Sequence, residues 1–123
     1  MGDHSDLIVY KKAFELSMQI FQLTKNFPRD EVFGLTSQIR RSSRSVCANV
    51  GEGYRKRRYE AHFISKLTDA DMENTETQIW LEFAEACGYI TTQIRNELYT
   101  QTQEIGKLLN YMLRNPEKFT GKF

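Results

Sequence analysis

The chain has 123 residues with 17 basic and 16 acidic side chains, a formal net charge of +1, and 40% hydrophobic residues. This length fits one ordinary domain with a single core and argues against two separate cores. The mean hydropathy of -0.57 argues against a membrane protein, and the hydrophobic content argues against a disordered chain.

Residues 7–27 predict the first helix, because their apolar side chains recur at steps of three and four. Ser5 or Asp6 is expected to cap its start, and Pro28 to end it. The apolar positions form two adjoining stripes, which is wider than one packing seam requires. Either this helix is deeply buried, or its second stripe packs against another subunit.

A second helix is predicted from Val32 to about Val50, with apolar residues again at three- and four-residue steps. Gly51 and Gly53 follow, and they are expected to mark its end or a bend near it. Their spacing does not match a phosphate-binding loop, and no strand precedes them. Small side chains along this helix would let a neighbouring helix approach closely: Ser42, Ser43, Ser45 and Ala48.

No Gly or Pro interrupts residues 59–87, so a third and longer helix is predicted there. Gly88 is expected to cap its C-terminus, and Thr91 or Thr92 to cap a fourth helix that ends near Arg114. No period-two alternation indicates a strand. The chain therefore predicts an all-α fold, an antiparallel up-down-up-down four-helix bundle.

The bundle domain is expected to span residues 6–119, between a disordered N-terminal tail at residues 1–5 and a C-terminal tail at residues 120–123. Cys47 and Cys87 have neither a CxxC partner nor a nearby His, so both are expected to be reduced, packed thiols. No leader or membrane segment is recognised. A cytoplasmic protein without a membrane partner is therefore expected.

The near-neutral net charge hides two oppositely charged segments. Residues 40–58 carry seven basic side chains against Glu52 alone, whereas residues 60–85 carry seven acidic ones against Lys66. Either these charges form solvated faces and intramolecular pairs, or part of them forms a surface for a polyanion.

An antiparallel second and third helix would place position 40 opposite about position 74. Arginine and carboxylate side chains are therefore expected to pair across this interface, with neighbouring polar groups satisfying the remaining atoms. The residues predicted for this structural cluster are Arg40, Arg41, Glu73, Asn74, Glu76 and Thr77. The expected role of the cluster is to fix the register of the two helices.

The run from Tyr54 to Tyr59 places four adjacent cations between two aromatic rings. Cations suit phosphates and aromatic rings suit unpaired bases, so the run indicates a nucleic-acid site. The alternative is a solvated corner between two helices. The candidate nucleic-acid-binding residues are Arg44, Tyr54, Arg55, Lys56, Arg57 and Arg58.

Metal and catalytic sites lack the residues that they need. A di-iron bundle requires two Glu-x-x-His pairs, but the chain has two histidines, His4 and His62, without that spacing. A cysteine nucleophile would need a histidine or another base positioned beside it, and only His62 is available for Cys47 and Cys87. We therefore expect no enzyme activity, metal, cofactor or small-molecule substrate.

Several motifs occur together: GLTSQIRRSS at residues 34–43, VCANVGEGY at 46–54, the acidic and aromatic positions of residues 73–81, GYI at 88–90, and L-x-V-Y-x-x-A at 7–13. This combination resembles the bacterial four-helix-bundle family of 23S rRNA intervening-sequence proteins, also called the S23 ribosomal protein family. The resemblance covers about residues 6–119. The chain departs from the commoner family pattern in two places, namely at Arg44 and at the pair Ala70-Asp71.

The resemblance implies a bundle that assembles as a ring-like homopentamer, which would account for the wide apolar arc of the first helix. A related protein, the accessory variability protein of diversity-generating retroelements, binds nucleic acid through a basic surface. We therefore expect a non-enzymatic oligomer that binds RNA or DNA. The alternative is a protein-interaction scaffold whose charged patches contact a protein partner.

Overall fold

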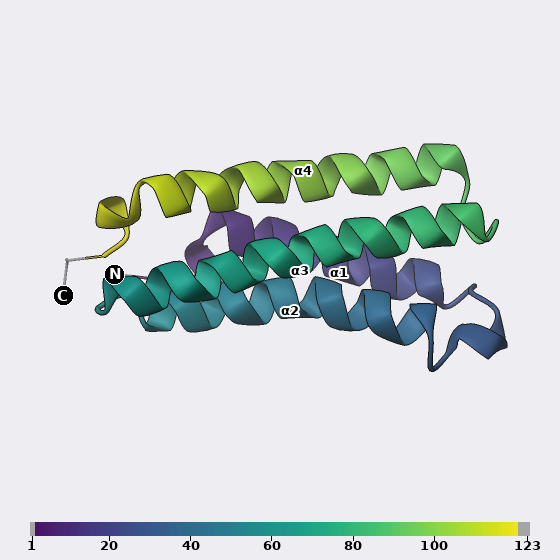
Figure 1. The fold of residues 1–123 in the computed structure, drawn as a ribbon, viewed down its shortest axis with the longest axis horizontal. Helices are drawn as coiled ribbons and strands as arrows, with labels where there is room; N and C mark the ends of the chain where they lie inside the picture. Colours follow the sequence, from purple (N-terminus) through teal and green to yellow (C-terminus); the bar gives the residue numbers. More distant parts are fainter. Residues whose placement is uncertain (1, 121–123) are drawn as a thin grey trace.

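A computed structural model describes residues 2–120, and the tail predictions at residue 1 and at residues 121–123 lie outside this range. Four α-helices make up the fold: α1 (Ile8–Thr24), α2 (Leu35–Arg55), α3 (Glu60–Ala86) and α4 (Thr92–Arg114). Short 3-10 turns lie at His4–Asp6, Arg29–Glu31 and Pro116–Lys118. The predicted all-α class is confirmed, and Figure 1 shows successive helices running in opposite directions.

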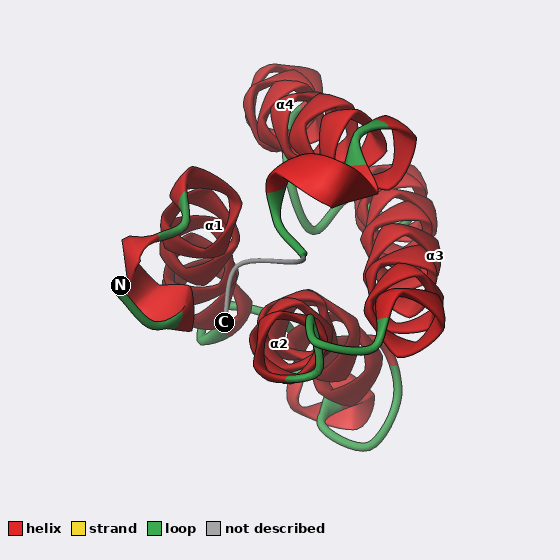
Figure 2. Ribbon diagram, turned by 90° about the vertical axis from the view of Figure 1, so that its left-hand side faces the viewer, coloured by secondary structure: helices red, strands yellow, loops and turns green. Residues whose placement is uncertain are grey.

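The four helices stand at the corners of a square, each packed against its neighbours in chain order (Figure 2). α1 also packs on α4, whereas α1 and α3 share no contact within residues 2–120 and lie at opposite corners. Large hydrophobic side chains from all four helices are almost completely buried along the axis: Ile20, Ile39, Phe63, Leu67, Leu81, Ile105 and Leu109. Burying one such side chain contributes about 1.5–3 kcal/mol, so this core is the main stabilising contribution to the bundle.

Gly51 and Gly53 lie inside α2, which ends only at Arg55. Of the two expectations for these glycines, a helix end or a bend near it, the helix end is wrong, because α2 continues past both of them. The physical reason is packing against α3, because a Cβ atom built on Gly53 would lie 3.1 Å from the Cβ of Lys66 and 3.6 Å from the carbonyl oxygen of Phe63. Glycine at this position lets the two helices approach closely just before the chain turns between them.

The connection between α3 and α4 follows the predicted capping. Gly88 has a φ of 78°, a left-handed conformation that glycine adopts without strain. The N–H of Tyr89 donates back to the carbonyl oxygen of Ala84, which closes the end of α3. Thr91 caps α4, because its Oγ1 accepts from the N–H of Ile94 at 3.1 Å.

The start of α1 differs from the prediction. Leu7 occupies the N-cap position without a side-chain hydrogen bond, so the cap expected from residue 5 or 6 does not form. Asp3 instead caps the preceding 3-10 turn, where its Oδ1 accepts from the N–H of Ser5 at 2.9 Å. The turn lies at the boundary between the predicted tail and the predicted bundle domain. It places the ring of His4 edge-on against Tyr10, with 4.8 Å between the ring centres.

Candidate nucleic-acid interface

The α2–α3 interface brings Arg41 together with both acids expected near it. Nη1 of Arg41 donates to Oε2 of Glu73 at 2.7 Å, and Nη2 donates to Oε2 of Glu76. Trp80 Nε1 donates to the same Glu76 oxygen at 3.1 Å. The side chains of Arg41 and Glu76 are 46% and 34% exposed, so this cluster lies at the surface.

Arg40 does not join this cluster and contacts α1 instead. Its Nε donates to Oγ1 of Thr24 at 2.8 Å, and its guanidinium lies 4.8 Å from the centre of the Phe21 ring. Adjacent residues on a helix point about 100° apart, so Arg40 and Arg41 serve different interfaces. The predicted pairing of Arg40 with a carboxylate is wrong for this reason.

Asn74 and Thr77 lie in the buried middle of α3, where they bond to the two neighbouring helices. Nδ2 of Asn74 donates to the backbone carbonyl oxygen of Thr102 on α4 at 2.8 Å. The hydroxyl of Thr77 lies 2.8 Å from the hydroxyl of Ser42 on α2. Their predicted role beside the arginines is therefore wrong, and they instead provide polar contacts inside the core.

The basic run forms the corner between α2 and α3, and we call residues 54–59 the basic corner. Residues 56–59 make the turn between the two helices at one end of the bundle. The exposed side chains of the corner are Arg55, Lys56, Arg58 and Tyr59. This position also suits cations because the last turn of α2 has the negative end of the helix dipole.

Arg57 contributes to the shape of the basic corner. Its Nη1 donates to the backbone carbonyl oxygen of Tyr54 at 2.9 Å, and its guanidinium lies 4.0 Å from the centre of the Tyr54 ring. Both side chains are half-buried. On the other side of the turn, Tyr59 packs edge-on against His62. The corner therefore presents cations and an aromatic ring from a backbone that these contacts support.

Three acidic residues of α2 and α3 form ion pairs with cations outside the basic corner. Glu52 forms an ion pair with Lys66 of α3, with 2.8 Å between Oε1 and Nζ. Glu73 and Glu76 bond to Arg41 in the middle of α3. These three carboxylates pair with cations outside the basic corner. They therefore do not neutralise the positive charge of the corner.

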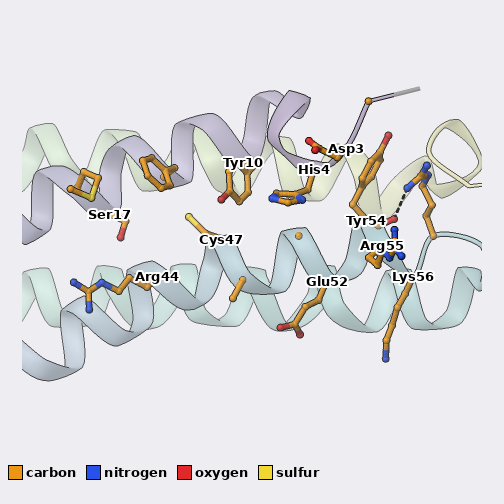
Figure 3. Close-up of a pocket in the computed structure, with 16 residues that line it drawn as sticks. Asp3, His4, Tyr10, Ser17, Arg44, Cys47, Glu52, Tyr54, Arg55 and Lys56 are labelled. Carbon is orange, nitrogen blue, oxygen red and sulfur yellow. Dashed lines mark hydrogen bonds between the residues drawn. The ribbon is translucent and has the colours of Figure 1, made fainter.

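A groove of about 930 Å³ runs between α1 and α2, from the basic corner to Arg44. Figure 3 shows His4, Tyr10 and Cys47 facing the space between the two helices, whereas Lys56 points away from α1. The larger apolar side chains that line the groove are Tyr10, Phe14, Met18 and Cys47. Sequence patterns did not predict the groove, because these positions belong to the same helical stripes as core residues.

Arg44 lies apart from the basic corner. It precedes Arg55 by about three turns of α2, or roughly 16 Å along the helix axis. Its guanidinium lies 5.7 Å from the centre of the Phe21 ring on α1. Among the candidate residues, the structure therefore groups Tyr54, Arg55, Lys56, Arg57 and Arg58 and separates Arg44 from them.

The remaining reactive side chains are the two free cysteines. Burial raises the pKa of the Cys47 thiol to about 11, which keeps it protonated near neutral pH. Cys87 is exposed, so its predicted packing is wrong. Among residues 2–120, no group of three or more His, Cys, Asp or Glu side chains is placed to hold a metal ion. No helix in the described part of the chain combines the length and the apolar character needed to cross a membrane.

Comparison with known proteins decides the family. A family model described as 23S rRNA-intervening sequence protein matches residues 5–111. The protein belongs to this family. The matched region contains α1, α2, α3 and most of α4, together with the basic corner. The resemblance drawn from the sequence motifs is confirmed.

A solved structure of the same family is similar to this chain. It is a protein of unknown function from the S23 ribosomal protein family of Bacteroides thetaiotaomicron, 30% identical in sequence, with a TM-score of 0.78. The match covers 87% of this chain and 96% of that one. A comparison with curated proteins gave no match. Neither the description of the 23S rRNA-intervening sequence protein family nor this neighbour's name states a catalytic activity.

Proposed function

We propose that this protein is a non-enzymatic oligomer that binds RNA or DNA at the basic corner. The observation that carries the proposal is the run of four cations from Arg55 to Arg58 at a turn flanked by Tyr54 and Tyr59. Such a cluster attracts phosphates of any sequence, and exposed rings offer surfaces for unpaired bases. In this proposal the protein acts in the cytoplasm and uses no metal, cofactor or small-molecule substrate.

Oligomerisation supports this function because one corner provides few contacts. A protein that neutralises only a few phosphates binds weakly at physiological salt. Several copies in one assembly multiply these contacts, since the first corner to bind holds the others at a high local concentration. We therefore propose a homo-oligomer, and specifically the pentamer that the family resemblance implies.

Fluorescence anisotropy with a structured RNA at low salt tests the proposed site. The double variant Arg55→Gln/Lys56→Gln removes two exposed cations from each corner and is expected to weaken binding several-fold, because phosphate contacts are lost. The control Lys25→Gln/Arg29→Gln removes two exposed cations near the opposite end of the bundle and should bind as the wild type does. Equal losses in both variants, or no binding by the wild type, would reject the basic corner as the site.

A protein partner is the second candidate, because exposed apolar side chains such as Phe14 and Phe83 accompany the charged surfaces. In that case the charged patches contact a protein instead of a nucleic acid. Affinity purification of the native complex separates the two functions. Nuclease treatment releases the partners only if nucleic acid holds them.

A further inference from the structure

Two stripes of apolar side chains are exposed on the bundle in addition to the basic corner. The first follows α1, where Tyr10, Phe14 and Met18 recur at four-residue steps along the groove between α1 and α2. Phe14 is 52% exposed and Met18 is 44% exposed. Large apolar groups gathered at one place on a surface mark a site of interaction, whereas single ones are ordinary.

The second stripe follows the outer face of α3. Met72, Ile79 and Phe83 are all exposed, and helical geometry places them within about 40° of one another around the axis. The opposite face of α3 is buried in the core through Leu67 and Leu81. A helix with apolar side chains on both faces is suited to burial on both, and its own bundle covers only one of them.

The surroundings of the two stripes carry opposite charge. The groove between α1 and α2 is lined by two acids, Asp3 and Glu52, and by four cations, namely Arg44, Arg55, Lys56 and Arg57. Arg44 stands at the rim of the groove. α3 contains seven acidic residues against Lys66, and two of them, Asp69 and Glu82, are exposed near its apolar stripe. The two surfaces are therefore complementary in charge as well as apolar character.

The stripes belong to helices at opposite corners of the bundle. α1 and α3 share no contact among the described residues, and Figure 2 shows them at opposite corners of the bundle. The two surfaces therefore cannot cover each other within one chain. Contact between two grooves, or between two α3 faces, would bring like charges together. A contact between unlike surfaces of successive copies avoids this, and it closes into a ring or continues as a filament.

We propose that the groove between α1 and α2 of one copy receives the outer face of α3 from a second copy. This inference rests on the proposed oligomer and specifies the interface that forms it. Phe14 and Met18 pack against the apolar stripe of α3, and Arg44 faces the acidic side chains beside that stripe. Arg44 therefore belongs to the interface between copies, and nucleic acid contacts the basic corner alone.

If the interface closes into a ring, the basic corners of all copies are arranged for binding one polyanion together. Cyclic symmetry places each residue of every copy at the same level along the ring axis. All basic corners then lie on one circle. A polyanion that follows this circle contacts several corners at once, which is the arrangement that multivalent binding requires.

Light scattering of two complementary variants tests the interface. Met18→Glu places an acid in the groove, and Ile79→Lys places a cation on the α3 stripe. Both original side chains are exposed, so the fold should persist. Each variant alone is expected to fall to the mass of one chain, 14.4 kDa. An equimolar mixture is expected to form dimers, because the intact groove of Ile79→Lys copies still accepts the intact stripe of Met18→Glu copies.

Tyr111→Glu changes an exposed ring on α4 and is the control, expected to keep the wild-type mass. Circular dichroism of every variant checks that the helices remain. A monomeric wild type, an assembly that survives either substitution, or a mixture that stays monomeric would overturn the interface. Arg44→Glu provides an independent check, since it should also lower the mass of the assembly.

Measurements of RNA binding distinguish a failure of the proposed interface from a failure of the proposed function. The monomeric variants keep the basic corner, so they should bind RNA more weakly than the assembly while retaining the salt dependence. An assembly that forms as described but binds no RNA at low salt would reject the function and leave the interface standing. A wild-type monomer that binds RNA at the basic corner would reject the interface and leave the site standing.

Discussion

Arg41 bonds to Glu73 and Glu76, but all three side chains remain partly exposed to water. Exposed ion pairs contribute about 0–1 kcal/mol, whereas breaking a buried pair costs about 3–5 kcal/mol. The exposure of these residues therefore determines how much they stabilise the protein. The cluster orients α2 against α3 and makes a small contribution to the free energy of unfolding.

Glu76→Ala is expected to lower the free energy of unfolding by about 1 kcal/mol or less. Glu73 still bonds to Arg41 in this variant, and Trp80, which loses its acceptor, is only half-buried. Urea unfolding measures the change, with Glu97→Ala on α4 as the control for an exposed acid. A loss of about 3 kcal/mol or more would mean that the pair behaves as a buried one.

The register of the α2–α3 interface could be predicted from the sequence, but the arginine that pairs there could not. Counting along an antiparallel pair gives the register to within about a turn, and Arg40 and Arg41 both fall within that tolerance. Which of them faces α3 depends on the rotation of α2 about its axis, which core packing of residues such as Ile39 determines. The hydrogen bond between Ser42 and Thr77 depends on the same rotation.

Within α2, two nearby glycines have different surroundings. A Cβ atom on Gly53 would lie 3.1 Å from the Cβ of Lys66, which is closer than ordinary van der Waals contact. A Cβ atom on Gly51 would lie 3.6 Å from the ring of His4, which is an ordinary contact. The sequence pattern assigned both to a helix end or a bend near it, because it contains no information about the neighbouring helix.

Gly51→Ala is expected to raise the Tm and Gly53→Ala to lower it. Alanine in a helix interior is favoured over glycine by about 1 kcal/mol, and nothing at Gly51 opposes that gain. At Gly53 the added methyl group would push against Lys66 Cβ, which is fixed to the backbone of α3. Calorimetry on both variants measures the order of the Tm values, and a rise of equal size in both would contradict the close approach of the helices.

Glu31 links the N-terminus of α2 to Tyr89, and no local motif could indicate the contact with Tyr89. Oε1 of Glu31 accepts from the N–H of Leu35 at 3.0 Å, and Oε2 accepts from the phenol of Tyr89 at 2.8 Å. These hydrogen bonds hold the pKa of Glu31 below its usual range. Tyr89 follows α3 and lies 58 residues further along the chain, so only the folded bundle brings the two together.

For the whole molecule, the all-α class and the order of the helices follow from periodicity, because each helix must bury an apolar stripe. The exposed surfaces do not follow from it. The sequence shows that residues 7–27 have more apolar positions than one seam needs, but not which of them the bundle covers. In the structure Ile20 is buried, whereas Phe14 and Met18 remain exposed. Deep burial therefore accounts for the stripe that contains Ile20, whereas packing of the exposed stripe against another subunit stays a prediction.

Polyanion binding at the basic corner is tested most directly by the slope of log K against log salt concentration for the wild type and a structured RNA. Each neutralised phosphate contributes about -0.9 to this slope on a duplex and about -0.7 on a single strand. With several corners in one assembly, we expect a steep negative slope that becomes shallower in Arg55→Gln/Lys56→Gln. A slope near zero, or an equally steep slope in the double variant, would contradict binding at this corner.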